Sequence, residues 1–238
     1  MDRIFEAQEA QAYEDWLATP AGTAYQLAST RLLGRVLDCR PGWRVLDVGC
    51  GLGVHLAYLR ERGLVCFGLE AGPVAARVAQ QRLGPQVEVE VGDAHDLPYE
   101  DNSFDAVTLV NTLELVDRPA QVLAEAARVA AARVCVITFN PFSWANLARL
   151  LHPGFHPLRG GRPLPVWSLR RLVRQVLGPV PRAWAGASPW PLAGLVGVCA
   201  AVTPRLRTRP LLVPAAGARG AARPAHSHGR LTVVPRGE

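Results

Sequence analysis

The spacing of apolar residues along the chain changes near position 41. Before that point, large apolar side chains recur every three or four residues, as they do on one face of an amphipathic helix. Residues from Asp2 to about Leu37 are therefore predicted to be helical, and Pro20 and Gly22 are predicted to divide them into two helices.

Beyond Pro41, short apolar runs typical of buried strands alternate with helical patterns. This alternation predicts an α/β fold: a mostly parallel sheet with helices on both faces, in three layers. Ligands bind at the carboxyl ends of the strands in such sheets. The predicted strands are 43–48, 64–70, 87–91, 104–110 and 133–139, and the predicted helices between them are 56–62, 73–83 and 118–132.

The pattern is less regular over residues 140–167. Their second half contains too much Pro and Gly for a regular element, so we interpret the segment as a loop or insertion on the substrate side of the ligand site. The hydroxyl of Ser168 is predicted to cap a helix over residues 169–177.

Up to two more strands are expected after Pro179. The segments PLLVPAA (210–216) and RLTVVP (230–235) are alternatives for the last strand, and the pattern does not choose between them. Residues 215–238 are rich in Arg, Ala and Pro and are expected to form a flexible tail.

A glycine-rich loop follows the first predicted strand, in the sequence VLDVGCGLGVH (45–55). Glycines at alternate positions allow a sharp turn and a close approach of the backbone to a ligand. Asp47 lies at the end of the strand, and its carboxylate would repel a phosphate but attract a cationic group. The spacing G-x-G-x-G also differs from the G-x-G-x-x-G of dinucleotide-binding loops, because Val54 stands where the third glycine would be.

Charge is distributed unevenly along the 238 residues. The chain has no lysine; up to Glu125 it has 10 Arg against 19 acids, and from Ala126 onward 16 Arg against Glu238 alone, for a net charge of +6. A GC-rich genome accounts for arginine in place of lysine but not for the loss of acids. A basic half can attract nucleic acid, anionic lipid or an acidic substrate.

Several features favour a cytoplasmic protein without a metal. The charged N-terminus lacks the apolar core of an export signal, and the longest apolar run, 192–203, is shorter than the roughly 20 residues that span a bilayer. His226 and His228 alone do not make a metal site. Five scattered cysteines, with no C-x-x-C pair, are interpreted as reduced thiols: Cys39, Cys50, Cys66, Cys135 and Cys199.

The glycine loop, the acid Glu70 about twenty residues later and the segment GDAHDLPYEDNSFDAV (92–107) together resemble class I S-adenosylmethionine (SAM) methyltransferases, specifically the methyltransferase type 11 family. The resemblance covers about 45–140. It implies a Rossmann-like, doubly wound, seven-stranded sheet over 41–214, preceded by a helical lid at 1–40, and SAM as cofactor.

The resemblance also assigns roles to individual residues. Glu70 is expected to accept hydrogen bonds from both ribose hydroxyls, or else to be a solvated acid at a strand end. Asp93 is expected to accept from the adenine amino group, and it is also a candidate helix N-cap. The remaining cofactor contacts implied are the loop residues Asp47, Gly49, Cys50, Gly51 and Gly53 at the methionine end, and Ala71 and Ala94 around the adenine.

On the acceptor side, Asn111 and Thr112 are expected to border the sulfonium. Many relatives have a His in the following L-E-H-V motif, where this chain has L-E-L-V, so the usual candidate for a general base is absent and Glu114 is left as a weak one. His152 and His156 are further weak candidates for an acceptor pocket. Tyr13 either belongs to a lid over the cofactor or packs as part of an amphipathic helix.

The function expected from these observations is methyl transfer from SAM to a small molecule by in-line displacement. Alternatives are an RNA or lipid acceptor recruited by the Arg-rich half, with an anionic membrane surface as partner, and a SAM-fold partner protein without catalysis. A nicotinamide-dependent enzyme is the least favoured.

Overall fold

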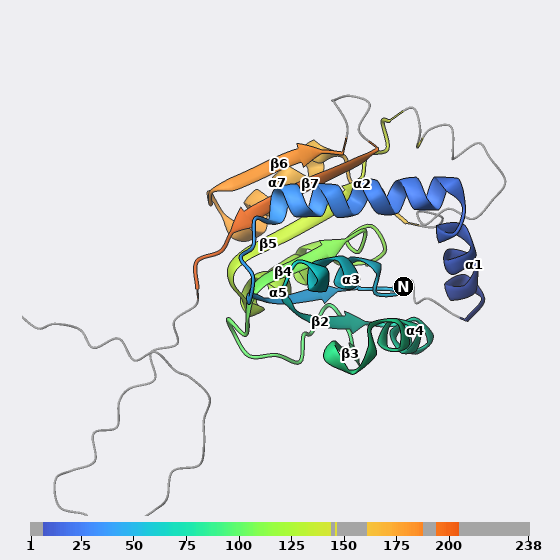
Figure 1. Ribbon diagram of the computed structural model, residues 1–238. Helices are drawn as coiled ribbons and strands as arrows, with labels where there is room; N and C mark the ends of the chain where they lie inside the picture. The colour runs from blue at the N-terminus through green and yellow to red at the C-terminus, as the bar shows by residue number, and fades with distance from the viewer. Residues whose placement is uncertain (1–6, 144–145, 147–160, 188–193, 205–238) are drawn as a thin grey trace, which may run out of the picture. The chain divides into compact units, whose positions relative to one another are not determined.

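The computed structural model describes residues 7–143, 146, 161–187 and 194–204, all within one compact unit that spans Met1–Arg205 (Figure 1). Both candidates for the last strand and the predicted tail lie outside these ranges. So do His152 and His156.

Two helices open the described chain, as predicted: α1 (Ala7–Leu17) and α2 (Pro20–Leu37). The Thr19 hydroxyl caps α2 by accepting from the amide of Gly22, and Pro20 occupies the first helical position, where a missing N–H costs nothing. Gly22 lies inside α2, and a Cβ there would meet the carbonyl oxygen of Trp16 at 2.1 Å. The proline thus begins the second helix, and the glycine lets α1 end close against it.

The sheet has seven strands in the order β3-β2-β1-β4-β5-β7-β6. The pairs among the first five strands are parallel, and β7 runs antiparallel between β5 and β6. This confirms the expected mostly parallel, doubly wound sheet. The strands are β1 (Arg44–Val48), β2 (Val65–Glu70), β3 (Glu88–Val91), β4 (Phe104–Val110), β5 (Ala130–Phe139), β6 (Arg182–Gly186) and β7 (Leu195–Ala201).

Helices cover both faces of the sheet (Figure 1). One apolar core lies between the sheet and α2, α3 and α4, and a second lies between the sheet and α5 and α7. Apolar residues that alternate along a strand supply the two cores in turn, as with Val45 and Leu46 of β1. The helices are α3 (Val54–Glu61), α4 (Pro73–Leu83), α5 (Pro119–Val129) and α7 (Val166–Leu177), with a 3₁₀ turn, η1, at Gly84–Gln86.

One prediction after residue 140 needs correction. Helix α7 begins at Val166 with Pro165 as its N-cap residue, so Ser168 lies within the helix and does not cap it. The two strands described after Pro179 are β6 and β7, and β7, inside the apolar run at 192–203, takes an inner position in the sheet. The described ranges contain no helix with both the length and the apolarity to cross a membrane.

Candidate functional site

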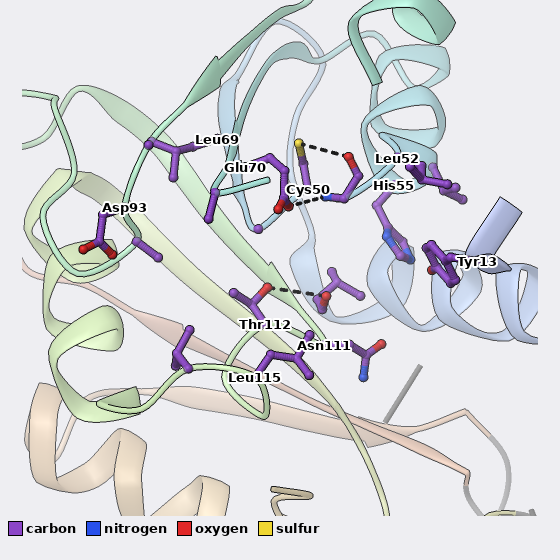
Figure 2. A pocket seen from close by; sticks show the side chains of 18 of the residues that line it. Tyr13, Cys50, Leu52, His55, Leu69, Glu70, Asp93, Asn111, Thr112 and Leu115 are labelled. Atoms are coloured by element: carbon purple, nitrogen blue, oxygen red, sulfur yellow. Dashed lines mark hydrogen bonds between the residues drawn. The ribbon is translucent and has the colours of Figure 1, made fainter. Parts of the chain in front are cut away.

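A pocket lies at the carboxyl edge of the sheet, and its empty space, counted together with the open solvent at its mouth, is about 930 Å³. Its walls come from the loop after β1, the ends of β2, β3 and β4, and the helices α1 and α2. Figure 2 shows Asp93 and Leu69 at one end of this space and Tyr13 and His55 at the other. The lining includes ten of the predicted cofactor residues: Tyr13, Gly49, Cys50, Gly51, Glu70, Ala71, Asp93, Ala94, Asn111 and Thr112.

The glycine loop has a conformation that side chains would oppose. Gly49 and Gly51 have φ angles of 72° and 54°, in the left-handed region that favours glycine. A Cβ on Gly49 would also lie 2.6 Å from Cγ2 of Thr112. The Thr112 hydroxyl donates to the carbonyl of Val48 at 2.8 Å, which fixes the loop after β4 against the end of β1.

Glu70, at the end of β2, braces the glycine loop from the other side. One carboxylate oxygen accepts from the Gly51 amide and the other from the Gly72 amide, both at 2.9 Å. Its side chain is buried at the pocket wall, and burial raises the pKa of Glu70 while these amide hydrogen bonds oppose the rise. The backbone amide of Ala71 also lowers this pKa, and a carboxylate has about four lone-pair sites, so Glu70 keeps room to accept from a ligand.

Asp47 and Gly53 lie behind the pocket and do not line it. The Thr108 hydroxyl donates to Asp47 Oδ1 at 2.6 Å, and burial raises the pKa of Asp47 to about 7 despite that hydrogen bond. A Cβ on Gly53 would meet the side chains of Leu83 and Ala79 at 2.9 and 3.2 Å, so this glycine permits close packing of α3 on α4.

Asp93 follows β3 and lies in a turn, not at a helix N-terminus. Its Oδ1 accepts from the backbone amide of His95 at 2.8 Å and lies 2.8 Å from Nδ1 of the same residue. These contacts, the amide first, lower the pKa of Asp93. The side chain is 60% exposed, so an ionised carboxylate faces the pocket with one oxygen that accepts neither of these hydrogen bonds.

A hydrogen-bonded network closes the pocket between β4 and α2. The Tyr25 hydroxyl donates to Oδ1 of Asn111 at 2.7 Å, and the Asn111 amide donates to Oε1 of Glu114 at 3.0 Å. The backbone amide of Phe139 donates to the same oxygen at 3.0 Å. Asn111 has a φ angle of 55°, unusual for a residue other than glycine, and both ends of its side chain are held by this network.

Glu114 is buried behind Asn111 and does not line the pocket. Burial raises its pKa to about 7, partly offset by the hydrogen bonds from Asn111 and Phe139. The second oxygen, Oε2, is buried without a hydrogen-bond partner in the described part of the chain. This position supports a structural role at the Asn111 side chain and argues against direct contact of Glu114 with an acceptor.

Aromatic rings from α1 and α2 cover the same end of the pocket. Tyr13 stacks on Trp16 with ring centroids 5.8 Å apart, Trp16 contacts Tyr25 at 5.3 Å, and Tyr25 stacks on Phe139 at 5.5 Å. Glu14 and Arg82 form an ion pair at 2.9 Å that ties α1 to α4. Tyr13 is therefore both part of the pocket wall and part of a packed helix. Its role as a lid over the cofactor stays a prediction.

The polar lining favours a neutral or cationic ligand. Its acidic members are Glu70 and Asp93, and no arginine is among the described lining residues. His55 also lines the pocket, but burial lowers its pKa to about 4, so the ring is uncharged near neutral pH. A ligand with a positively charged sulfur or amine suits this charge distribution, whereas a pyrophosphate does not.

The sequence model of a family described as "Methyltransferase domain" matches residues 46–136, from β1 to β5. The chain carries a class I, SAM-dependent methyltransferase domain. SAM is the cofactor of this domain.

Among curated proteins, the methyltransferase domain is similar to an uncharacterized 37.1 kDa protein in transposon TN4556 of Streptomyces fradiae, with 39% identity over 136 residues, 53% of this chain and 38% of that protein. It is also similar to demethylmenaquinone methyltransferase of Renibacterium salmoninarum, with 35% identity over 129 residues, 54% of this chain and 50% of that one. The chain thus spans half or less of the length of these two relatives.

Among solved structures, the fold matches a SAM-dependent methyltransferase from Thermotoga maritima, described as a possible histamine N-methyltransferase, with a TM-score of 0.67. Sequence identity is 20%, and the match covers 82% of this chain and 96% of that one. At this identity, the match supports the fold.

Sequence reasoning missed several lining residues of the methyltransferase domain. Tyr25 fits the amphipathic pattern of α2, and nothing in its spacing signals that its hydroxyl reaches β4. His55, in the first turn of α3, packs against Ser29, with 3.0 Å between Nε2 and Oγ. It also lines the pocket. Leu115 and Val116 were noticed only for the missing histidine of their motif and form an apolar wall instead.

Proposed function

We propose that this chain transfers a methyl group from SAM to a small-molecule acceptor. The main support for this proposal is the pocket at the glycine loop of the methyltransferase domain. Glu70 and Asp93 line this pocket, and no arginine is among its described lining residues. When bound, SAM would supply a methyl group on a positively charged sulfur: an acceptor lone pair would form a bond to the methyl carbon while the carbon–sulfur bond breaks in line, its electron pair leaving with S-adenosylhomocysteine.

The residues present fit this cofactor. Gly49 and Gly51 leave a cradle that a Cβ would strain, and Glu70 holds the second of these glycines in place. We assign the ribose hydroxyls to the lone pairs that Glu70 retains and the adenine amino group to Asp93, with Ala71 and Ala94 as apolar and backbone contacts. The roles proposed for Asp47 and Gly53 are indirect, through the shape of the loop.

The acceptor side of the site is built for positioning. Asn111, Thr112 and Leu115 form the wall after β4, and Tyr25 holds the Asn111 side chain in one orientation. Fixed orientation and exclusion of water speed an in-line displacement. A general base contacting the acceptor is not required by this proposal, which is consistent with Glu114 lying behind the wall.

The demethylmenaquinone relative supports an apolar organic acceptor as the class to test first. We also propose a reducing, cytoplasmic setting. The five cysteines of the chain are scattered along the sequence without a C-x-x-C pair, as is typical of reduced thiols.

Titration calorimetry with SAM and with NAD tests the cofactor directly. We expect SAM to bind with a dissociation constant in the micromolar range typical of enzyme substrates and NAD to give no heat of binding. Incubation of the purified protein with isotope-labelled SAM and a lipid or aqueous extract, followed by mass spectrometry, then identifies the acceptor. Tight SAM binding without label transfer to any fraction would contradict catalysis while leaving the pocket assignment intact.

A further inference from the structure

Exposed aromatic side chains gather around helix α7. Of the large hydrophobic side chains exposed in the described ranges, three are aromatic: Phe142, Trp167 and Trp184, which are 62%, 53% and 47% exposed. Phe142 stacks on Trp167 with ring centroids 5.1 Å apart, although one follows β5 and the other begins α7. Three exposed aromatic rings close to one helix are unusual on a monomer surface and point to an interaction site.

Arginines of α7 share the face that bears Trp167. Residues three, four and seven positions apart lie on one side of a helix, which places Arg170, Arg171 and Arg174 beside the Trp167 side chain. All three arginines are exposed. The guanidinium carbon of Arg170 lies 5.7 Å from the ring centroid of Trp184, which joins the edge strand β6 to the same surface. We call this surface the α7 outer face: Phe142, Trp167, Arg170, Arg171, Arg174 and Trp184.

Acidic side chains are scarce around the α7 outer face. The sequence has no Asp or Glu between Glu125 and Glu238, so neither α7 nor β6 contributes one. The neighbouring helix α5 contributes Glu125, whose carboxylate is bound by Arg128 at 2.8 Å. The positive charge of the three arginines on α7 therefore has no acid on its own element to offset it.

We propose that the α7 outer face docks on an anionic lipid surface. Tryptophan rings rest at the boundary between headgroups and acyl chains, and arginines on the same face bind lipid phosphates. One face of each ring is already covered, by the other ring of the Phe142–Trp167 stack or by Arg170, which reduces the ring surface open to stacking with RNA bases. Insertion among lipid headgroups needs no free ring face. A second copy of this chain would bring like charges together.

The α7 outer face begins at the pocket edge of the sheet. Just before α7, the carbonyl of Leu164 accepts from the Thr138 hydroxyl of β5 at 3.1 Å, and the amide of Arg162 donates to the carbonyl of Glu114 at 2.7 Å. Docking would therefore hold the carboxyl edge, where the pocket lies, near the lipid. The proposal itself requires neither SAM nor an acceptor.

Co-sedimentation of the full chain with vesicles tests the proposal. We expect binding to vesicles of mixed phosphatidylcholine and phosphatidylglycerol, and much weaker binding to phosphatidylcholine alone or at high salt. The triple variant R170Q/R171Q/R174Q should lose about fivefold in affinity for each arginine. The double variant W167A/W184A should lose about tenfold or more at unchanged net charge.

The matched control for charge is R31Q/R62Q/R77Q, which removes three exposed arginines from α2, from the turn after α3 and from α4. It should bind anionic vesicles like the unmodified chain, and Leu27→Ala is the corresponding apolar control. Equal losses in control and test variants would overturn the proposal. The proposal would also be overturned if the arginine variant bound vesicles normally but bound single-stranded RNA more weakly, because the face would then bind RNA. A dimer in sedimentation that the W167A/W184A variant dissociates would overturn it too, because the face would then join two copies of the chain.

Discussion

The hydroxyl of Tyr25 donates a 2.7 Å hydrogen bond to Oδ1 of Asn111, across 86 residues of sequence. This contact joins the N-terminal helix α2 to the loop after β4. Asn111 keeps a left-handed backbone conformation and also donates to Glu114, so the position of its side chain depends on one partner three residues away and on one from a distant part of the chain.

Replacing Tyr25 with Phe should weaken SAM binding while the fold remains. The change leaves the buried Oδ1 of Asn111 without its phenolic donor, which typically costs about 1–3 kcal/mol, and part of this should appear as a lower affinity at the neighbouring sulfonium site. Titration calorimetry with SAM measures it. Tyr58→Phe is the control, because Tyr58 does not line the pocket, and equal SAM affinities in all three proteins would remove Tyr25 from the site.

Replacing Glu70 with Gln should reduce SAM affinity by about 1–3 kcal/mol. The carboxylate now accepts from two backbone amides, and an amide NH₂ would face one of those donors. The loop around Gly51 and the proposed ribose contact are then lost together. Glu61→Gln, an exposed change on α3, should bind SAM normally. The assignment fails if Glu70→Gln and the unmodified chain give the same dissociation constant.

Replacing Gly49 with Ala should destabilise the protein more than the same change at Gly42. Both glycines have positive φ angles, 72° and 85°, and both variants bear that strain of about 1 kcal/mol or more. Only at position 49 would the new Cβ meet another side chain, that of Thr112, whereas nothing lies within 4 Å at position 42. Urea unfolding of both variants isolates the steric part.

A further change at Thr112 checks that explanation. The double variant G49A/T112S removes the Cγ2 atom that the new Cβ would approach and keeps the hydroxyl that donates to Val48. It should recover part of the lost free energy of unfolding. Purely additive effects of the two substitutions would show that the clash does not exist.

Stability should fall as pH rises from about 5 to 7. Burial raises the pKa of Asp47 from 3.8 to about 7 and that of Glu114 from 4.5 to about 7, so the folded state binds more protons than the unfolded state in this range. The stabilisation is fully present below the unfolded values and is lost as pH rises through the folded ones. The pKa of His55, which burial lowers from 6.5 to about 4, opposes this trend, but it is one group against two. Urea unfolding at several pH values should therefore still show a net decline, on the order of 1 kcal/mol or more.

Glu114→Gln should make that decline shallower. The Gln carbonyl can accept from Asn111 and Phe139 as the carboxylate does, without taking up or releasing a proton. The remaining slope combines Asp47, which lowers stability as pH rises, with His55, whose pKa lowered to about 4 acts in the opposite direction. Glu100→Gln on the surface should leave the slope unchanged. If the free energy of unfolding of Glu114→Gln depends on pH as that of the unmodified chain does, the Glu114 carboxyl has the same pKa in the folded and unfolded states. The raised pKa of Glu114 is then wrong.

The strands up to residue 139 could be read from the sequence because each is a short apolar run between clear turn residues. The same signal fails for β6, whose sequence Arg-Ala-Trp-Ala-Gly has no β-branched residue. The apolar pattern also does not predict the order of the strands in the sheet. The run 192–203, which contains β7, is visible in the sequence, but the antiparallel position of β7 between β5 and β6 depends on pairing across the sheet.

The candidate site divides in the same way. The glycine loop, Glu70 and Asp93 follow strands directly, so local pattern places them at the carboxyl edge. Tyr25 could not be found, since its role depends on a contact between α2 and β4 that no local period encodes. The predicted helix cap at Ser168 is wrong. A hydroxyl before an apolar run resembles an N-cap, but α7 begins earlier, directly after Pro165.

The inner position of β7 bears on synthesis of the chain. When residues up to Gly194 have left the ribosome, β5 has a hydrogen-bonding edge without a neighbour, and β6 has no strand to join it to the sheet. Only the emergence of Leu195–Ala201 fills that gap. A nascent chain stalled before this segment would expose an aggregation-prone strand, so the sheet is completed almost at the end of the described sequence.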